Sequence, residues 1–475
     1  MKKLGFCIVL MIAIFEVQAQ TLIATSNYSN ATANHNQRKI VRDSLDNVYV
    51  VFTDSTESGK VIKGVWHNKV TNQWNKATKI VDGCNPSLSI NKKGQFFLVF
   101  ESNNSLREIN FTSSRDFSNW SQPFRLSKDQ TDNKLPICDT DSSGKLNVFW
   151  IQNNNSLNQS LIYASVIEDA LVLRKTITTK TEINDIAIAN HLQNSNDDLI
   201  FSAQFSSDSI LFLRTTNNMK SIDTLYRTRG SQPCISFNSL APFQHWEYDE
   251  NSIRLLFIDI NKQLTEVECG FDRHPEIGPL IRILSTKPTD YICIDDVIPP
   301  IGYSYLFMQN GNLYHGFSYG ASTYSSTILD TIKSIPLNPT LAYKNFNSKY
   351  VDFVWMQKMD PGFNIYYKRD AKLIHVGVKD YESGKGFSIT GYPNPFTDQL
   401  SIIVDVENQQ QKPILEIYNS NSKRVKVLIS KNAGNQYAYL WDATDQYNNI
   451  LPSGLYIIMC TVGKTKTARK VIYTK

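Results

Sequence analysis

The stretch that decides the fold begins at residue 85, where residues 85–90 read NPSLSI and residues 92–94 read KKG. An apolar run, FFLVF at residues 96–100, follows this turn, and a third extended segment ends at Phe111. The same order returns further along the chain as LPIC at 135–138, SSG at 142–144, LNVFW at 146–150 and LIYA at 161–164. Short apolar runs between polar turns, with alternation of period two, predict antiparallel strands rather than helices.

Five further copies of this pattern can be traced. They begin near Arg38, Asn184, Gln232, Asp290 and Asn338. Successive copies start about 46 to 58 residues apart, a spacing typical of four-stranded propeller blades. One such sheet cannot bury both faces, whereas a ring of sheets stacks face on face and leaves only short edges. We therefore expect an all-β chain with a β-propeller of about seven four-stranded blades over residues 21–379.

Two points of this architecture stay open at the level of sequence. The fourth to sixth copies are degenerate, so six or eight blades also fit, and an array of β-sandwiches is the structural alternative. Residues 22–24 are expected to supply the strand that closes the ring against the last blade. Aromatic residues recur at the end of a central strand and are expected to pack blade against blade. They are Phe52, Phe100, Trp150, Phe257 and Trp355.

Residues 1–20 read as a secretory signal peptide. Two lysines precede an apolar run at residues 4–15, and Val17 and Ala19 have the spacing of a cleavage site for small residues. The run is too short to stay as a membrane span, and no later segment is apolar enough to become one. The chain carries a net charge of +5, which belongs to the signal peptide and the tail. A neutral body without a basic stripe argues against nucleic-acid binding.

Six cysteines remain after processing, an even number that permits disulfides in an exported chain. None of them forms a pair at the spacing of a metal site. Cys138, Cys234 and Cys293 fall on similar strands of different repeats. Buried thiols, each within its own blade, are therefore favoured over bridges.

The sequence pattern changes at residue 391, where residues 391–396 read GYPNPF. Short alternating segments follow, with LSI at 400–402, LEIYN at 415–419, YLWD at 439–442, LPSGLYI at 451–457 and KVI at 470–472. About 80 residues of this kind predict a small immunoglobulin-like β-sandwich of seven strands. Residues 380–390, with Gly384 and Gly386, are expected to form an accessible linker.

This tail resembles the type A C-terminal sorting domain of proteins exported by the type IX secretion system. The resemblance rests on Tyr392, Pro393, Asn394, Pro395, Phe396, Trp441, Asp442, Pro452, Ser453, Gly454 and Tyr456. The chain departs from the pattern at residues 421–423, 443 and 448–449, where the family usually carries glycine. The resemblance implies that residues 391–475 are recognised by the outer-membrane translocon after passage through the periplasm. It also implies removal of the tail by a sortase-like peptidase, which leaves the body released or attached to the outer cell surface.

Residues 111–121, FTSSRDFSNWS, resemble a degenerate Asp box, the turn between outer strands of sialidase-type propellers. Ser114, Asp116 and Trp120 match in residue type, whereas Ser118 stands where glycine is usual and the loop is one residue short. In that family the carboxylate binds loop amides and the tryptophan packs between strands. The resemblance implies a sialidase-like propeller and a structural turn, and it assigns no catalytic role.

The body shows no catalytic signature. A sialidase site would need three arginines, a Tyr–Glu pair and an acidic residue, but the arginines do not recur at one blade position. Glu101 and Asp259 lie near strand ends, where acidic residues usually serve turns. A calcium loop at residues 139–144 is disfavoured because Trp150 stands at its twelfth position. No catalytic residue, metal ligand or cofactor is therefore assigned.

The sequence favours a propeller that binds an extracellular glycan or protein. Trp66, Trp246 and Tyr248 break the repeat and are the predicted ligand contacts. A sialidase-like exo-glycosidase is the first alternative, in which case the chain would be a glycoside hydrolase. A structural component of the cell surface is the second.

Overall fold

The computed structural model describes residues 20–128, 130–154, 158–180, 182–190, 199–206, 208–216, 219–242, 251–270, 279–294, 303–319, 322–327, 335–342, 350–371, 387–392, 396, 398–406, 412–419, 423–428, 436–463 and 465–474. The chain divides into two compact units, Met1–Lys372 and Leu373–Lys475. Within the described ranges, no helix is long and apolar enough to cross a membrane.

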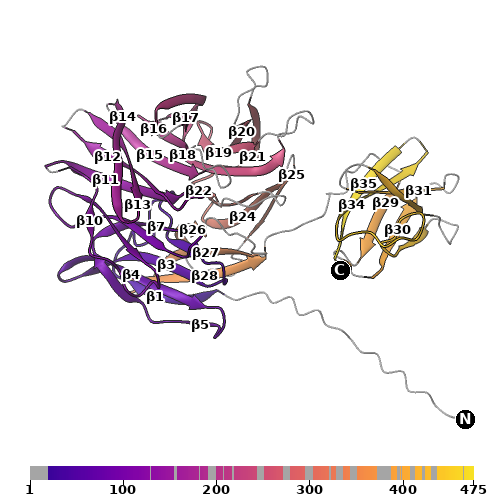
Figure 1. Ribbon diagram of the computed structural model, residues 1–475, viewed down its shortest axis with the longest axis horizontal. Coiled ribbons are helices and arrows are strands. Elements are labelled where there is room, and N and C mark those ends of the chain that lie inside the picture. The colour runs from indigo at the N-terminus through magenta and orange to yellow at the C-terminus, as the bar shows by residue number, and fades with distance from the viewer. Residues whose placement is uncertain are drawn as a thin grey trace, which may run out of the picture. The chain divides into compact units, whose positions relative to one another are not determined.

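The first unit is a propeller of seven blades as far as its described strands show (Figure 1). Blade 1 contains β2 (Ile40–Arg42), β3 (Val48–Thr56), β4 (Gly59–Asn68) and β5 (Gln73–Trp74), with β6 (Thr78–Asp82) also paired to β4. Blade 2 contains β7 (Cys84–Ile90), β8 (Phe96–Glu101), β9 (Ile109–Ser114) and β10 (Phe124–Arg125). Blade 3 contains β11 (Asp132–Thr140), β12 (Leu146–Asn153), β13 (Gln159–Ile167) and β14 (Ala170–Lys180).

Blades 4 and 5 share one long strand, β18 (Ser221–Pro242). Blade 4 contains β15 (Ile183–Asn190), β16 (Leu199–Phe205), β17 (Ser209–Thr216) and the first part of β18. Blade 5 contains the second part of β18 with β19 (Asn251–Asp259), β20 (Leu264–Gly270) and β21 (Leu280–Ser285). Blade 6 contains β22 (Tyr291–Ile294), β23 (Tyr303–Gln309), β24 (Asn312–Tyr319) and β25 (Ser322–Thr327).

Blade 7 closes the ring with strands from both ends of the unit. It contains β26 (Leu337–Leu341), β27 (Tyr350–Lys358), β28 (Phe363–Ala371) and the N-terminal β1 (Thr21–Ser26). β1 pairs antiparallel with β28, with Leu22 opposite Tyr366. The prediction that residues 22–24 close the ring is confirmed, and with it the count of seven blades.

The core lies between the blades, because successive residues of each strand point to opposite faces of its sheet. In β3, Val48, Val50 and Phe52 pack against blade 7. Their neighbours Tyr49 and Val51 pack against blade 2. Equivalent apolar clusters fill every other interface around the ring. Phe52, Phe100, Trp150, Phe257 and Trp355 are all buried, as predicted.

A β-bulge recurs where four of the inner strands begin. Asn85, Leu135, Gln232 and Asn338 have positive φ angles of 51°, 54°, 53° and 47°, and each precedes a proline. The strand register shifts at each of these positions. A bulge leaves one residue outside the ladder, and proline has no N–H to leave unpaired there. The bulges therefore present free backbone carbonyls at one end of the ring.

The second unit is a sandwich of two sheets. One contains β29 (Phe387–Tyr392), β30 (Leu400–Val406) and β33 (Gln436–Trp441). The other contains β31 (Ile414–Asn419), β32 (Arg424–Leu428), β34 (Gly454–Val462) and β35 (Thr465–Tyr473). These are the seven strands of an immunoglobulin-like sandwich, as predicted.

The linker expected at residues 380–390 needs a correction at its C-terminal end. Residues 387–390 belong to β29, which pairs with β30. Ile389 is buried in the shared core of the sandwich, so this short alternating segment is held by packing. Residues 380–386 lie outside the described part of the chain.

Candidate functional site

Residues 27–39, which we call the axial segment, connect β1 to β2 and pass through the centre of the ring. Their polar side chains bind the inner strands of different blades. Thr32 Oγ1 donates to the carbonyl of Asn338 in blade 7 at 2.9 Å. Asn36 Nδ2 donates to the carbonyl of Pro233 in blade 5 at 2.8 Å. Contacts with the inner strands of opposite blades place this segment at the propeller axis.

The bulge prolines provide most of the acceptors for this segment. Gln37 Nε2 donates to the carbonyl of Pro136 in blade 3 at 2.9 Å. Lys39 Nζ donates to the carbonyl of Pro86 in blade 2 and to Gln37 Oε1. Because buried carbonyls need partners, the recurring X-Pro bulges and the polar axial segment satisfy each other.

Two cations of the axial segment are buried. Arg38 Nη2 donates to the carbonyl of Ile188 at 2.9 Å, and its Nη1 lies 2.6 Å from Asp139 Oδ1. Burial lowers the pKa of Lys39 to about 7. Neither side chain faces solvent, so both stabilise the segment rather than offer charge to a ligand.

An open pocket of about 510 Å³ lies at the bulge end of the axis. Its lining combines axial-segment residues with the starts of the inner strands of blades 3 to 7. Its polar members include Asn34, His35, Asn36, Asn184, Asp185, Gln204, Gln232, Tyr291 and Asn338. This volume is within the range of about 300–1,000 Å³ that is typical of ligand sites. We call it the axial pocket.

His35 and Asp185 lie within hydrogen-bond distance of each other in the axial pocket. His35 Nε2 lies 3.1 Å from Asp185 Oδ2. Asp185 Oδ1 accepts hydrogen bonds from Asn36 Nδ2 at 3.2 Å and from the Ile186 N–H at 2.8 Å. The carboxylate is thus held in one orientation by groups from both the axial segment and β15.

Tyr291 lines the axial pocket, and its hydroxyl is unsatisfied. Its ring packs edge-on against His35, with centroids 5.8 Å apart. The hydroxyl oxygen is buried and has no hydrogen-bond partner within the described structure. Burial raises the pKa of Tyr291 well above its usual value, so the hydroxyl keeps its proton. An unpaired buried donor of this kind costs stability unless a water or ligand satisfies it.

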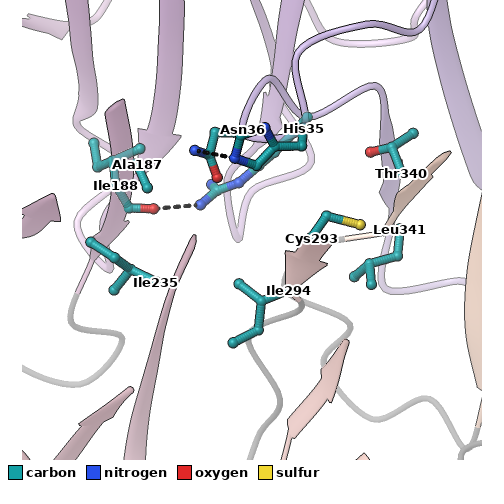
Figure 2. Close-up of a pocket in the computed structure, with 10 residues that line it drawn as sticks. His35, Asn36, Ala187, Ile188, Ile235, Cys293, Ile294, Thr340 and Leu341 are labelled. Atoms are coloured by element: carbon teal, nitrogen blue, oxygen red, sulfur yellow. Dashed lines mark hydrogen bonds between the residues drawn. The ribbon is translucent and has the colours of Figure 1, made fainter. Parts of the chain in front are cut away.

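A much smaller cavity of about 20 Å³ lies further along the axis (Figure 2). His35, Asn36 and Arg38 bound one side of it, and apolar residues such as Ile188, Ile235 and Ile294 bound the other. A single water needs about 10–15 Å³ of such volume, so little more than one fits. The axial segment therefore closes the floor of the axial pocket.

Of the three predicted ligand contacts, only Trp66 lies within the described residues. Trp66 is half-buried in β4 and stacks on Tyr49, with ring centroids 6.0 Å apart. It does not line the axial pocket. Trp246 and Tyr248 lie outside the described residues. The sequence features that form the pocket are the polar run of residues 32–39 and the residues next to the inner-strand bulges, but neither feature by itself indicates a pocket.

The turn at residues 114–120 is organised by Asp116. Its Oδ1 accepts hydrogen bonds from the backbone N–H groups of Ser118 and Asn119 at 2.9 and 2.7 Å. Ser114 Oγ also donates to Oδ1, and Trp120 Nε1 donates to the Phe117 carbonyl. These hydrogen bonds hold the pKa of Asp116 well below its usual value. The turn lies between β9 and β10, away from the axial pocket.

The arginines of the body are used in ion pairs within or between blades. Arg254 contacts Glu266 and Glu268, and Arg369 contacts Asp352. No arginine, lysine or glutamate is among the described residues that line the axial pocket. The three arginines and Tyr–Glu pair of a sialidase are therefore not assembled in this described lining.

The other acidic candidates have structural surroundings. Glu101 is buried and accepts the N–H of Leu135 at 2.8 Å, and burial raises the pKa of this carboxyl. Asp259 accepts two backbone N–H groups in the turn between β19 and β20. Asp141 does the same in the turn between β11 and β12. Across the described ranges, no group of three or more metal-ligating side chains converges.

The tail motifs divide between core and surface. Phe396 and Tyr456 pack against the buried ring of Trp441 at centroid distances of 5.3 and 5.1 Å. Trp441 Nε1 donates to the Thr444 carbonyl. Asp442, Pro452 and Ser453 are exposed, Gly454 begins β34, and Tyr392 ends β29. Residues 393–395 lie outside the described part of the chain.

Comparisons with solved structures support the propeller fold. A PL25 ulvan lyase, a polysaccharide lyase solved with -[GlcA(1-4)Rha3S]-, is 10% identical over 75% of this chain and 98% of its own, with a TM-score of 0.53. The BP39L lectin from Burkholderia pseudomallei is 10% identical over 72% of this chain and 97% of its own, with a TM-score of 0.52.

The tail, by contrast, is matched by its sequence. No curated protein matches the chain significantly. Residues 390–474 match the model of the secretion system C-terminal sorting domain. This tail interacts with the type IX secretion machinery and directs export to the cell surface or the extracellular space. The chain therefore combines a β-propeller body with a C-terminal sorting domain of the type IX secretion system.

Proposed function

We propose that the propeller binds an extracellular glycan in the axial pocket. The observation that carries this proposal is the lining itself. Amide side chains, which both donate and accept hydrogen bonds, surround the rigid Asp185 carboxylate, and Tyr291 lines the same pocket. Sugars present many hydroxyl groups that need such partners. Export to the cell exterior places the pocket where glycans are encountered, and two propellers of similar fold are named as a lectin and a polysaccharide lyase.

Binding of the mature full chain to a glycan array, followed by calorimetry on each hit, tests this proposal. Tyr291→Phe removes only the unpaired hydroxyl and should weaken binding about tenfold if that hydroxyl donates to the sugar. Tyr314→Phe is the matched control, because Tyr314 lies in the same blade but does not line the axial pocket. Equal affinities of wild type and Tyr291→Phe, or the absence of any glycan hit, would overturn the proposal.

The two alternatives make different predictions. A sialidase-like exo-glycosidase should release the fluorophore from a panel of fluorogenic glycosides, with the sialoside among them. A structural surface component should neither bind a glycan in the axial pocket nor lose function in Tyr291→Phe. Neither alternative gains support from a specific group in the described lining, and the Ser114–Trp120 turn supports a structural role for those residues only.

We also propose a processing route for the chain. Residues 1–20 are removed as a signal peptide, the outer-membrane translocon recognises residues 391–475, and a sortase-like peptidase then cuts within residues 380–386. The sorting-domain match and the two glycines at 384 and 386 support this route. Intact-mass measurement of the exported protein should show loss of both ends. A mass that retains residue 475 would contradict the cleavage step.

A further inference from the structure

We infer that the axial pocket receives the uncharged end of a glycan chain and excludes ends that carry a carboxylate or sulfate. This inference rests on the proposed glycan binding and adds the chemical class and the mode of entry. Both follow from the way residues 27–39 build the pocket floor.

The first step is the closed floor. His35 and Asn36 line both the axial pocket and the small cavity beyond it. The hydrogen bonds of residues 36–39 to the carbonyls of Pro233, Pro136 and Pro86 fix the segment across the axis. The cavity beyond these residues has a volume of only about 20 Å³, which is too small for a sugar. The axial pocket therefore accepts a chain end that enters from the bulge side.

The second step is charge. Among the described residues that line the axial pocket, Asp185 carries the carboxyl group and His35 the imidazole. The nearest cation of the axial segment, Arg38, is turned toward Asp139 and the carbonyls of Cys138 and Ile188. An anionic sugar would thus meet a carboxylate without a lysine or arginine in the described lining to offset it. Like charges in a partly desolvated site repel strongly.

The third step is complementarity. Five neutral amide side chains line the pocket around the fixed Asp185 carboxylate: Asn34, Asn184, Gln204, Gln232 and Asn338. Gln232 uses both ends of its amide within the protein, and Asn34 and Asn184 use their Nδ2 groups, which leaves their Oδ1 atoms as acceptors. A carboxylate accepts hydrogen bonds from sugar hydroxyls well, and amides pair with hydroxyls in either direction. The geometry suits a sugar whose polar groups are all hydroxyls. A site for a uronate would instead need a cation to pair with the carboxylate of the sugar.

Matched glycan pairs test the inference on the wild-type mature chain. Each pair shares its linkage and differs only in the charge of the terminal residue, as in a glucose-ended and a glucuronate-ended oligosaccharide. We expect at least tenfold weaker binding of the charged member in calorimetry. A neutral chain whose terminal residue is blocked by a bulky group should also lose binding.

Asp185→Asn tests the cause, because it removes the charge and keeps the shape. The affinity for the neutral glycan should then exceed that for the anionic glycan by about threefold or less. Asp82→Asn, on the exposed strand β6, should leave this ratio of affinities unchanged. Equal or tighter binding of anionic ends by the wild type would overturn the inference and leave glycan binding intact. An unchanged ratio in a folded Asp185→Asn would overturn the electrostatic cause. Binding of no glycan of either kind would overturn the proposed function itself.

Discussion

Arg38 and Asp139 form a buried ion pair, with Nη1 2.6 Å from Oδ1, that joins the axial segment to β11. Both side chains are at most 9% exposed. Arg38→Ala leaves the carboxylate buried without its cation, which typically costs about 3–5 kcal/mol. We expect urea unfolding of the propeller to show a loss of this size. Lys79→Ala, which breaks the exposed Lys79–Asp82 pair, is the control and should change the free energy of unfolding by less than about 1 kcal/mol.

Ring closure by β1 gives a second prediction from two adjacent residues. Ile23 is 8% exposed and packs between blades 1 and 7, whereas Leu22 is 51% exposed. Ile23→Ala should lower the free energy of unfolding by about 2–4 kcal/mol, because it removes buried apolar contacts and leaves a cavity. Leu22→Ala should stay within about 0.5 kcal/mol of the wild type. Equal effects of the two variants in thermal or urea unfolding would contradict the role of β1 in closing the ring.

Acid stability should depend on Asp132. Arg107 Nε and Nη2 donate to the two carboxylate oxygens of Asp132 at 2.8 and 2.6 Å. This pair lowers the pKa of Asp132 to about 2. Because the folded pKa lies below the unfolded value of about 3.9, the pair stabilises the fold above about pH 4.

That stabilisation is lost as the pH falls from about 4 toward about 2. Asp132→Asn should therefore be less stable than the wild type at pH 5, and the difference should shrink on acidification. The free energy of unfolding, measured in urea at intervals from pH 5 downward, checks this. If the two free energies of unfolding differ by the same amount over the whole pH range, the Arg107–Asp132 pair is not the source of the pH dependence.

Export should depend on the core of the sorting domain. Trp441 is buried against Phe396 and Tyr456, and its indole N–H is satisfied by the Thr444 carbonyl. Trp441→Ala should cost about 3–5 kcal/mol and unfold this small sandwich. We expect the variant to accumulate in the periplasm, as shown by immunoblots of cell fractions. Tyr447→Ala, at an exposed position, is the control and should be exported normally.

The thiols of the mature chain should be reduced and protected. None of these six buried cysteines is in a disulfide: Cys84, Cys138, Cys234, Cys269, Cys293 and Cys460. Burial raises the pKa of Cys269 and of Cys460 to about 12, which also suppresses reactivity. A maleimide reagent should label all six only after denaturation, as read by intact mass. Any lower number in the denatured, unreduced protein would reveal a disulfide.

Much of the fold could be predicted because its signals are local and repeated. Each predicted start of a repeat, from Arg38 to Asn338, lies in an observed inner strand or within a few residues of one. Alternation within strands such as β3 assigns Val50 and Val51 to opposite blade interfaces, which is what a ring of sheets requires. The tail was recognisable for a similar reason, since its motifs follow one another in order along a single short stretch.

The axial pocket could not be predicted in this way, because it joins residues that are distant along the chain. Asn36 and Asp185 are separated by 149 positions and become partners only when seven blades share one axis. The polar run at residues 32–39 is visible in the sequence, but nothing local distinguishes a surface loop from a segment buried at the centre of a ring. Periodicity and motif order were enough for the propeller, its closing strand and the export route. Closure of the ring, which brings seven inner strands to one axis, decides where the pocket lies, what its floor is and which charges it contains.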